Sequence, residues 1–530
     1  MANSTQTQRA ALSSDLIALR ETLLGLLPQL EAQPSWYASI FFERKRSKTF
    51  SANLKQTNIA DQASAGVVFR IYDGYTLFER ATDDLSAQNL NRTVAEFVQR
   101  VKNSPHPEGA TLRAYPAPSW KDRLSSGELD PEIKNQIPAD VTARTPVHFG
   151  IRFMEDPRKL DAGIALEKLK ALLDRCQKLA PESGLKESDL TYVAARQTTA
   201  DEESIFIDRG SVLSQTLLRQ ALTVITMSES DRTHLRVGGL GGLEAIEVEE
   251  NELRTLLKDL AALKSAHKLT PGKYRVLFGP VLSGVLAHEA FGHSQEADTC
   301  ARGRSKAWEL YASGEKVGNE HATILNNPAI FETGGKPFAA WGSYFFDEEG
   351  WLAQSQVLLD HGRLKAPMTN LTSALRLGVA RTANGKRESW ANGVYTRQTN
   401  TYFSPGKKTL AGLMSELGDG FLALHPAGGM EDPKGMGIQV GISYLQEVKG
   451  GALTGRVFKG PAGGDIQLTG YTPDVLNSIV DKSKIEFDSP EPDKALHPWN
   501  DAGGCGKYHK EFVFAGCGGP YMLLDQVILG

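Results

Sequence analysis

Residues 274–293, YRVLFGPVLSGVLAHEAFGH, decide the fold of the C-terminal half of the chain. Residues 274–278 are largely apolar and aromatic, which is typical of a short buried strand. The apolar residues among 281–286 predict a helix that follows this strand and carries His288 and His293 into a protected interior. A strand that leads directly into a histidine-bearing helix indicates a buried functional site.

The two histidines lie five residues apart, and Glu289 follows the first of them. Histidines four apart share one face of an α-helix, whereas a separation of five rotates them by roughly 140° from each other. A π-type turn brings positions five apart back to nearly one face, and Gly292 is where the backbone deforms most easily. We therefore predict a π-bulge or a helix end between Glu289 and His293, with Glu289 as the general base.

Two histidines at nearly this spacing, the first followed by a glutamate, are typical of a zinc-binding helix. A catalytic zinc ion usually takes three protein ligands and leaves one position open for water. Candidates for the third ligand are Glu296, Asp298, Cys300 and Cys505. Glu296 follows His293 by three residues and so lies on the same helical face. Cys505 lies in a glycine-rich segment that can approach a metal closely, and neighbouring Lys507 would favour its thiolate form. Spacing alone leaves Glu296 and Cys505 as alternatives.

Composition limits the classes of function. The 530 residues are 41% hydrophobic and 23% charged, with a net charge of −4, which is typical of a folded protein that does not bind nucleic acid. Four scattered cysteines suit a reducing compartment. No apolar stretch approaches the roughly 20 residues of a membrane span, and the start of the chain lacks the pattern of a signal peptide. We expect a soluble, cytoplasmic protein without a membrane partner.

Periodicity predicts the elements of both halves. Helices are expected near residues 15–30, 90–101, 159–179 and 244–267, and strands near 36–50, 65–72, 76–79 and within 190–226. Two hairpins are expected in the C-terminal half, one pairing 341–346 with 351–359 and one pairing 438–448 with 453–458.

The predicted fold class is α+β, with an N-terminal α/β two-layer region followed by a strand-rich C-terminal domain that carries the metal-binding helix. We predict an N-terminal α+β domain over 1–110, a proline-rich connector over 111–150, a central α/β domain over 151–270 and a catalytic domain over 271–530.

Several motifs together resemble those of one enzyme family. Residues 288–293, HEAFGH, followed by Glu296 and Asp298, resemble the HExxxH signature of the TldD/PmbA metallopeptidases, once named modulators of DNA gyrase. Three further segments are similar to the C-terminal domain of that family: residues 384–389, 397–402 and 505–507, together with the closing residues 523–530. The resemblance is close from about residue 274 onward and looser over 35–245.

The resemblance implies that His288, His293 and Cys505 bind Zn²⁺, which selects Cys505 over Glu296 as the third ligand. It also implies a metallopeptidase that degrades short or unfolded linear peptides, or matures ribosomal peptides, in the cavity of a dimer. The dimer would form with a second copy or with a related subunit. The alternatives are a metal-binding partner or chaperone subunit without hydrolytic activity, and an amidase acting on a small molecule.

The expected mechanism assigns the remaining candidate residues. Glu289 would accept a proton from water and pass it to the leaving amine. Glu296 and Asp298 would orient the imidazole rings of the metal ligands. Arg387 and Asn400 would hold polar groups of the substrate. An extended peptide could pair with an exposed edge strand near the zinc, which would give affinity with little side-chain selectivity.

Overall fold

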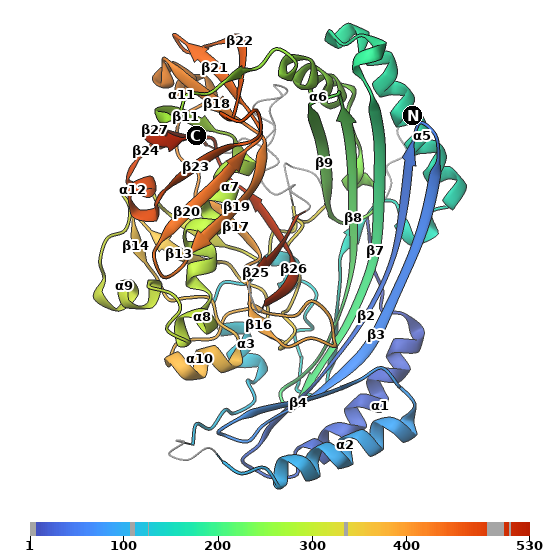
Figure 1. Cartoon of the computed structure of the whole chain (residues 1–530). Coiled ribbons are helices and arrows are strands. Elements are labelled where there is room, and N and C mark those ends of the chain that lie inside the picture. Colours follow the sequence, from blue (N-terminus) through green and yellow to red (C-terminus); the bar gives the residue numbers. More distant parts are fainter. Residues whose placement is uncertain (1–6, 107–111, 126, 333–337, 485–502, 508–509) are drawn as a thin grey trace.

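The computed structural model of the protein describes residues 7–106, 112–125, 127–332, 338–484, 503–507 and 510–530. A seven-stranded sheet formed by the N-terminal half packs against the C-terminal half, which contains a ten-stranded and a six-stranded sheet (Figure 1). Helices and strands alternate irregularly along the chain. This mixed architecture confirms the predicted α+β class.

The N-terminal sheet has the strand order β4-β3-β2-β7-β8-β5, with β9 also paired to β8. Its strands are β2 (Tyr37–Asn53), β3 (Thr57–Tyr72), β4 (Leu77–Thr82), β5 (Pro146–Gly150), β7 (Tyr192–Asp208), β8 (Ser211–Met227) and β9 (Arg232–Leu240). Strand β2 pairs directly with β7, so that Ser39 lies opposite Asp208. Segments from the first and third predicted domains thus contribute to one sheet, and the division of the chain into four units stays a prediction.

Four helices cover one face of this sheet, two at each end (Figure 1). They are α1 (Ser14–Leu30), α2 (Ala87–Lys102), α5 (Ala162–Leu179) and α6 (Glu250–Leu263). On β2, Phe42 joins the core of α1 and α2 and Phe50 joins the core of α5 and α6; an even separation places both on the same face. The four predicted helices are confirmed, α6 being shorter than expected. In the described part of the chain, no helix has the length and apolarity to cross a membrane.

The opposite face of the N-terminal sheet packs on the C-terminal half, whose ten-stranded sheet is built around β11 (Gly272–Phe278). Strand β11 runs parallel to β18 (Gly420–Ala423) and antiparallel to β27 (Met522–Leu529). It leads into α7 (Pro280–Ala287), as predicted, and α7 contacts strands of both C-terminal sheets. The helix that introduces the histidines is therefore enclosed on two sides.

One predicted hairpin forms only in part, and the other is confirmed. Residues 341–346 and 351–359 meet at a single antiparallel bridge between Phe346 and Leu352, where the Phe345 carbonyl accepts a hydrogen bond from the Ala353 N–H at 2.9 Å. The pairing does not extend into a ladder: the Phe345 N–H donates instead to the Gln215 side-chain oxygen, at 3.0 Å. The hairpin of this region is β13 (Gln356–Asp360) with β14 (Arg363–Leu364). The later hairpin forms between β21 (Leu445–Lys449) and β22 (Ala452–Lys459).

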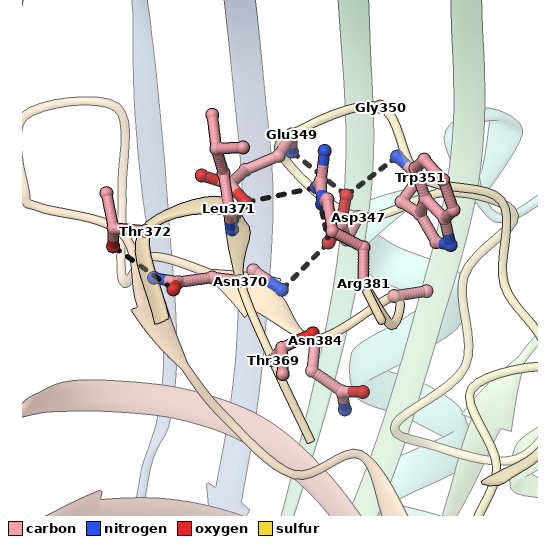
Figure 2. A network of polar contacts seen from close by, with 12 residues as sticks. Asp347, Glu349, Gly350, Trp351, Thr369, Asn370, Leu371, Thr372, Arg381 and Asn384 are labelled. Atoms are coloured by element: carbon pink, nitrogen blue, oxygen red, sulfur yellow. Dashed lines mark hydrogen bonds and ion pairs between the residues drawn. The ribbon is translucent and has the colours of Figure 1, made fainter. Parts of the chain in front are cut away.

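A buried polar network fixes the loop around Asp347 against the N-terminal sheet (Figure 2). The Asp347 carboxylate accepts hydrogen bonds from the backbone N–H groups of Glu349, at 3.0 Å, and Trp351, at 2.8 Å. The Glu349 carboxylate in turn accepts from Arg381 at 3.1 Å and from Arg70 of β3 at 2.6 Å. These buried bonds join the two halves of the molecule where the sequence predicted a simple turn.

Candidate metal centre

A π-helical turn brings the two histidines together. Helix α7 ends at Ala287, and a π-helical turn covers His288–Gly292, in which the His293 N–H donates to the His288 carbonyl. The two imidazole rings lie 4.7 Å apart between centroids. A side chain at Gly292 would meet the amide oxygen of the buried Gln398 at 2.2 Å, so the Gln398 side chain would have to move. The π-bulge predicted from the five-residue spacing is confirmed.

Cys505 lies beside these histidines, although it is 212 residues from His293 in the chain. It belongs to β25 (Gly503–Lys507), which pairs with β26 (Lys510–Gly518) so that Cys505 faces Val513. Its Sγ is 3.0 Å from Nε2 of His293. The ligand atoms of His288, His293 and Cys505 all lie within 4.8 Å of one another.

This donor set suits a zinc ion. Two imidazoles and a thiolate with one open position are an established ligand set for catalytic zinc. Ligand atoms bonded to zinc at 2.0–2.3 Å are separated by about 3.3–3.8 Å in a tetrahedral site. The separation of Cys505 Sγ from His293 Nε2 is 3.0 Å, and all three ligand atoms lie within 4.8 Å of one another.

The charges at the site favour a thiolate. Burial raises the pKa of Cys505, but His293 and His288 outweigh it and hold this pKa well below its usual range. Burial lowers the pKa of His293, while Cys505 and Glu296 raise it to about 10. Without metal, His293 and Cys505 therefore form an imidazolium–thiolate pair at neutral pH.

Glu296 is paired with the second ring nitrogen of His293. Its carboxylate is 3.5 Å from Nδ1 of His293, while Nε2 of the same ring faces Cys505. A carboxylate at the second ring nitrogen fixes the orientation of a metal-binding imidazole. Burial raises the pKa of Glu296, but Lys510 and His293 hold it well below its usual range. The orienting role of Glu296 stays a prediction, and its contact with His293 is the geometry which that role needs.

Asp298 is connected to the site through Lys510. The buried Lys510 ammonium donates to Glu296 at 2.6 Å and to Asp298 at 2.8 Å. Arg397, also buried, donates to the Cys505 sulfur at 3.0 Å and to Glu296 at 3.3 Å. Neither cation was identified from the sequence, which offered Lys507 instead; the side chain of Lys507 lies outside the described residues.

Glu289 is buried and faces a second carboxylate, Glu431 of β19 (Pro426–Asp432). Carboxylate atoms of both residues lie within 4.8 Å of a ring nitrogen of His293. Burial raises the pKa of Glu289 to about 7, assisted by the hydrogen bond with Glu431 and opposed by the two histidines. A carboxyl group with this pKa can both accept and release a proton near neutral pH. Glu431 was not identified from the sequence.

His288, Glu289, His293 and Cys505 line a cavity of about 890 Å³. Its other walls come from β9 of the N-terminal sheet, from β19 and from the loop 463–465. The site thus lies between the two halves of the molecule, with room for a peptide segment.

The two residues expected to contact substrate have other partners. Arg387 is buried and pairs with Glu79, at 2.7 Å. The Asn400 amide donates to the Asn327 carbonyl at 2.8 Å and to the Ser343 hydroxyl at 3.0 Å. Neither is among the described residues that line the cavity. Both side chains hold loops of the protein together, and we no longer assign them to the substrate.

Comparison with known proteins relates this chain to metallopeptidases. Residues 271–530 match the model of the PmbA/TldA metallopeptidase C-terminal domain. A metalloprotease of Methanothermobacter thermautotrophicus is 27% identical over 374 residues, covering 69% of this chain and 74% of that protein. A zinc metalloprotease TldD homolog of Saccharolobus solfataricus is 28% identical over 214 residues, covering 40% of this chain and 44% of its own length.

The crystal structure of TldE from Thermococcus kodakarensis has the same fold, with a TM-score of 0.66 and 14% identity over 97% of this chain and 100% of that one. The matched C-terminal domain and the metalloprotease relatives define a metallopeptidase family. The chain belongs to the TldD/PmbA family.

Proposed function

We propose that this protein is a zinc-dependent peptidase that hydrolyses short or unfolded linear peptides, with His288, His293 and Cys505 as metal ligands. The observation that carries the proposal is the approach of these three donors to within 4.8 Å, beside a buried glutamate, in a cavity large enough for a peptide. A structural zinc site would need neither an adjacent acid–base group nor an open cavity.

Zinc held by these residues would supply the Lewis acidity that activates a water molecule as nucleophile. Glu289 accepts the proton of the attacking water and delivers it to the leaving amine as the peptide bond breaks. Glu431, hydrogen-bonded to Glu289, keeps that carboxyl group able to hold a proton between these two transfers. Glu296 holds the ring of His293 in one orientation.

Strand β19 is the proposed binding edge for the peptide backbone. It ends the ten-stranded sheet and pairs only with β20 (Gly437–Ile442) among the described strands. Its residues 427–430 are exposed, and it passes so close to Glu289 that a Cβ at Gly429 would lie 2.6 Å from the Glu289 Cγ. Backbone pairing there would place varied sequences beside the general base. We further propose a cytoplasmic location and a dimer, with a second copy or a related subunit.

The decisive experiment combines metal analysis with peptide cleavage. We expect wild type and Cys176→Ala to bind zinc, and Cys505→Ala to lose most of it; Cys176 is a buried cysteine of α5, outside the site. We expect Glu289→Gln to keep zinc but lose cleavage of an unstructured peptide pool by about 100-fold or more. Full activity of Glu289→Gln with bound metal would exclude Glu289 as the base. Metal binding without cleavage by wild type would instead indicate the non-hydrolytic partner subunit.

A further inference from the structure

A row of basic side chains on β9 faces the cavity. Side chains two apart on a strand share a face, which groups Arg232, His234 and Arg236. The alternate residues face the other way: Val237 is buried in the core formed with α6, and the Thr233 hydroxyl donates to the Leu256 carbonyl of α6 at 3.1 Å. The packing of α6 therefore directs the basic row away from that helix.

All three residues of this row line the cavity that contains the metal donors. Strand β9 belongs to the N-terminal sheet, so the basic row is the part of the cavity wall contributed by the N-terminal half. Arg232 and Arg236 are exposed within it. The neighbouring Asp231 is already paired with Lys459.

The acidic groups of the cavity are distributed differently. Glu289 and Glu431 lie at the metal donors, Asp231 adjoins Arg232 in the chain and pairs with Lys459, and Asp465 lies in a separate loop of the wall. The cavity lining therefore carries both signs of charge, and the wall formed by β9 is where it offers guanidinium groups to a substrate. Guanidinium groups bind carboxylates through paired hydrogen bonds.

We propose that Arg232 and Arg236 bind a carboxylate of the peptide, so that the site prefers substrates with an acidic side chain or a free C-terminus on one side of the cleaved bond. This inference rests on the proposed peptidase function. Backbone pairing at β19 leaves the side-chain sequence open, and the basic row adds a selectivity for charge.

The test uses the zinc-loaded full chain and three fluorogenic peptides of equal length. One carries glutamates and an amidated C-terminus, one replaces the glutamates with glutamine and keeps a free C-terminus, and one has glutamine and an amide. We expect wild type to favour at least one carboxylate peptide over the neutral one by about fivefold in kcat/KM, and added salt to reduce the difference. The peptide that is favoured identifies the source of the carboxylate.

The double variant Arg232→Gln/Arg236→Gln should abolish this preference, mainly through KM. Arg254→Gln should keep it, because Arg254 lies on the exposed side of α6 and pairs with Glu250. Fluorescence anisotropy measures the binding of the same peptides to Glu289→Gln and so shows the preference without turnover. Equal kcat/KM for the three peptides, or an unchanged preference in the double variant, would overturn the proposal and leave the peptidase function intact. Absence of cleavage together with selective binding would refute the peptidase function alone.

Discussion

Arg397 donates a hydrogen bond from its guanidinium group to the sulfur of Cys505, with 3.0 Å between Nη2 and Sγ. The same nitrogen also donates to the Cys505 carbonyl at 2.7 Å, so the cysteine is held at both its side chain and its backbone. A positive charge in contact with sulfur favours the thiolate, which is the form that binds metal. Arg397 thus favours the metal-binding form of Cys505 in the metal-free protein.

Replacing Arg397 should make the thiolate harder to form. In metal-free Arg397→Gln protein, we expect the ultraviolet absorbance of the Cys505 thiolate to disappear at a higher pH than in wild type, because the neighbouring charge is lost. Subtracting the spectrum of Cys505→Ser isolates this cysteine. An unchanged titration would mean that the two histidines alone hold the thiolate.

Zinc binding should release about one proton at neutral pH. His293 has a pKa of about 10 without metal and must lose its proton to bind, whereas Cys505 is already a thiolate. Calorimetric titration in buffers of different ionisation enthalpy measures this number. A wild-type enthalpy that does not change with the buffer would contradict the imidazolium–thiolate pair.

Lys510→Met should destabilise the protein by about 3–5 kcal/mol, because it leaves Glu296 and Asp298 buried without their shared cation. Chemical unfolding of the metal-free protein measures the loss. The triple variant that adds Glu296→Gln and Asp298→Asn should recover a substantial part of it. Lys449→Met, which removes an exposed lysine paired with the exposed Asp419, should unfold close to wild type. Wild-type stability of Lys510→Met would show that this buried cluster is not paired as described.

Gly429→Ala should reduce peptide cleavage at least tenfold while leaving zinc content unchanged. The new methyl group would lie 2.6 Å from Cγ and 2.7 Å from a carboxylate oxygen of Glu289, so it must displace the general base or bend β19. Gly437→Ala on the adjacent strand is a matched control, since its nearest atom would be at an ordinary 3.8 Å. Equal activity of the two variants would show that β19 is free to move away from Glu289.

Glu348 should make the protein less stable as pH rises. Burial, with a further contribution from Glu43, raises the pKa of Glu348 from 4.5 to about 8. Between these values the folded state holds a proton that the unfolded state has lost, so the free energy of unfolding falls as pH increases through this window. In Glu348→Gln, the free energy of unfolding should fall less over this pH window than in wild type. In the exposed control Glu388→Gln, it should fall as much as in wild type. Parallel curves for wild type and Glu348→Gln would contradict the raised pKa.

The local geometry of the metal centre followed from the sequence because it depends on neighbouring residues. A five-residue spacing is incompatible with a shared face on an α-helix, so the π turn between His288 and Gly292 could be predicted. The choice of Cys505 could not be made in this way, since it depends on a contact across 212 residues. Only the resemblance to a known family distinguished it from Glu296.

Residues that reach the site through strand register were missed. Lys510 and Glu431 carry no local pattern that separates them from surface charges, and their burial is created by the pairing of β26 and β19 with other strands. Likewise, Tyr344 and Phe345 resemble strand residues because they are aromatic and buried, yet packing between the two halves buries them outside any strand. Tertiary contacts determine these features, and no short stretch of sequence contains them.

The pairing of β2 with β7 has a consequence for biosynthesis. Arg44 and Glu203, ion-paired across these strands, are 159 residues apart. At a synthesis rate of about 5–20 residues per second, the β2–β3 hairpin would wait roughly 8–30 seconds for its neighbour to leave the ribosome. During that time one long edge of β2 is open to pairing with other nascent chains. The yield of folded protein is therefore expected to depend on how well this hairpin is protected early in translation.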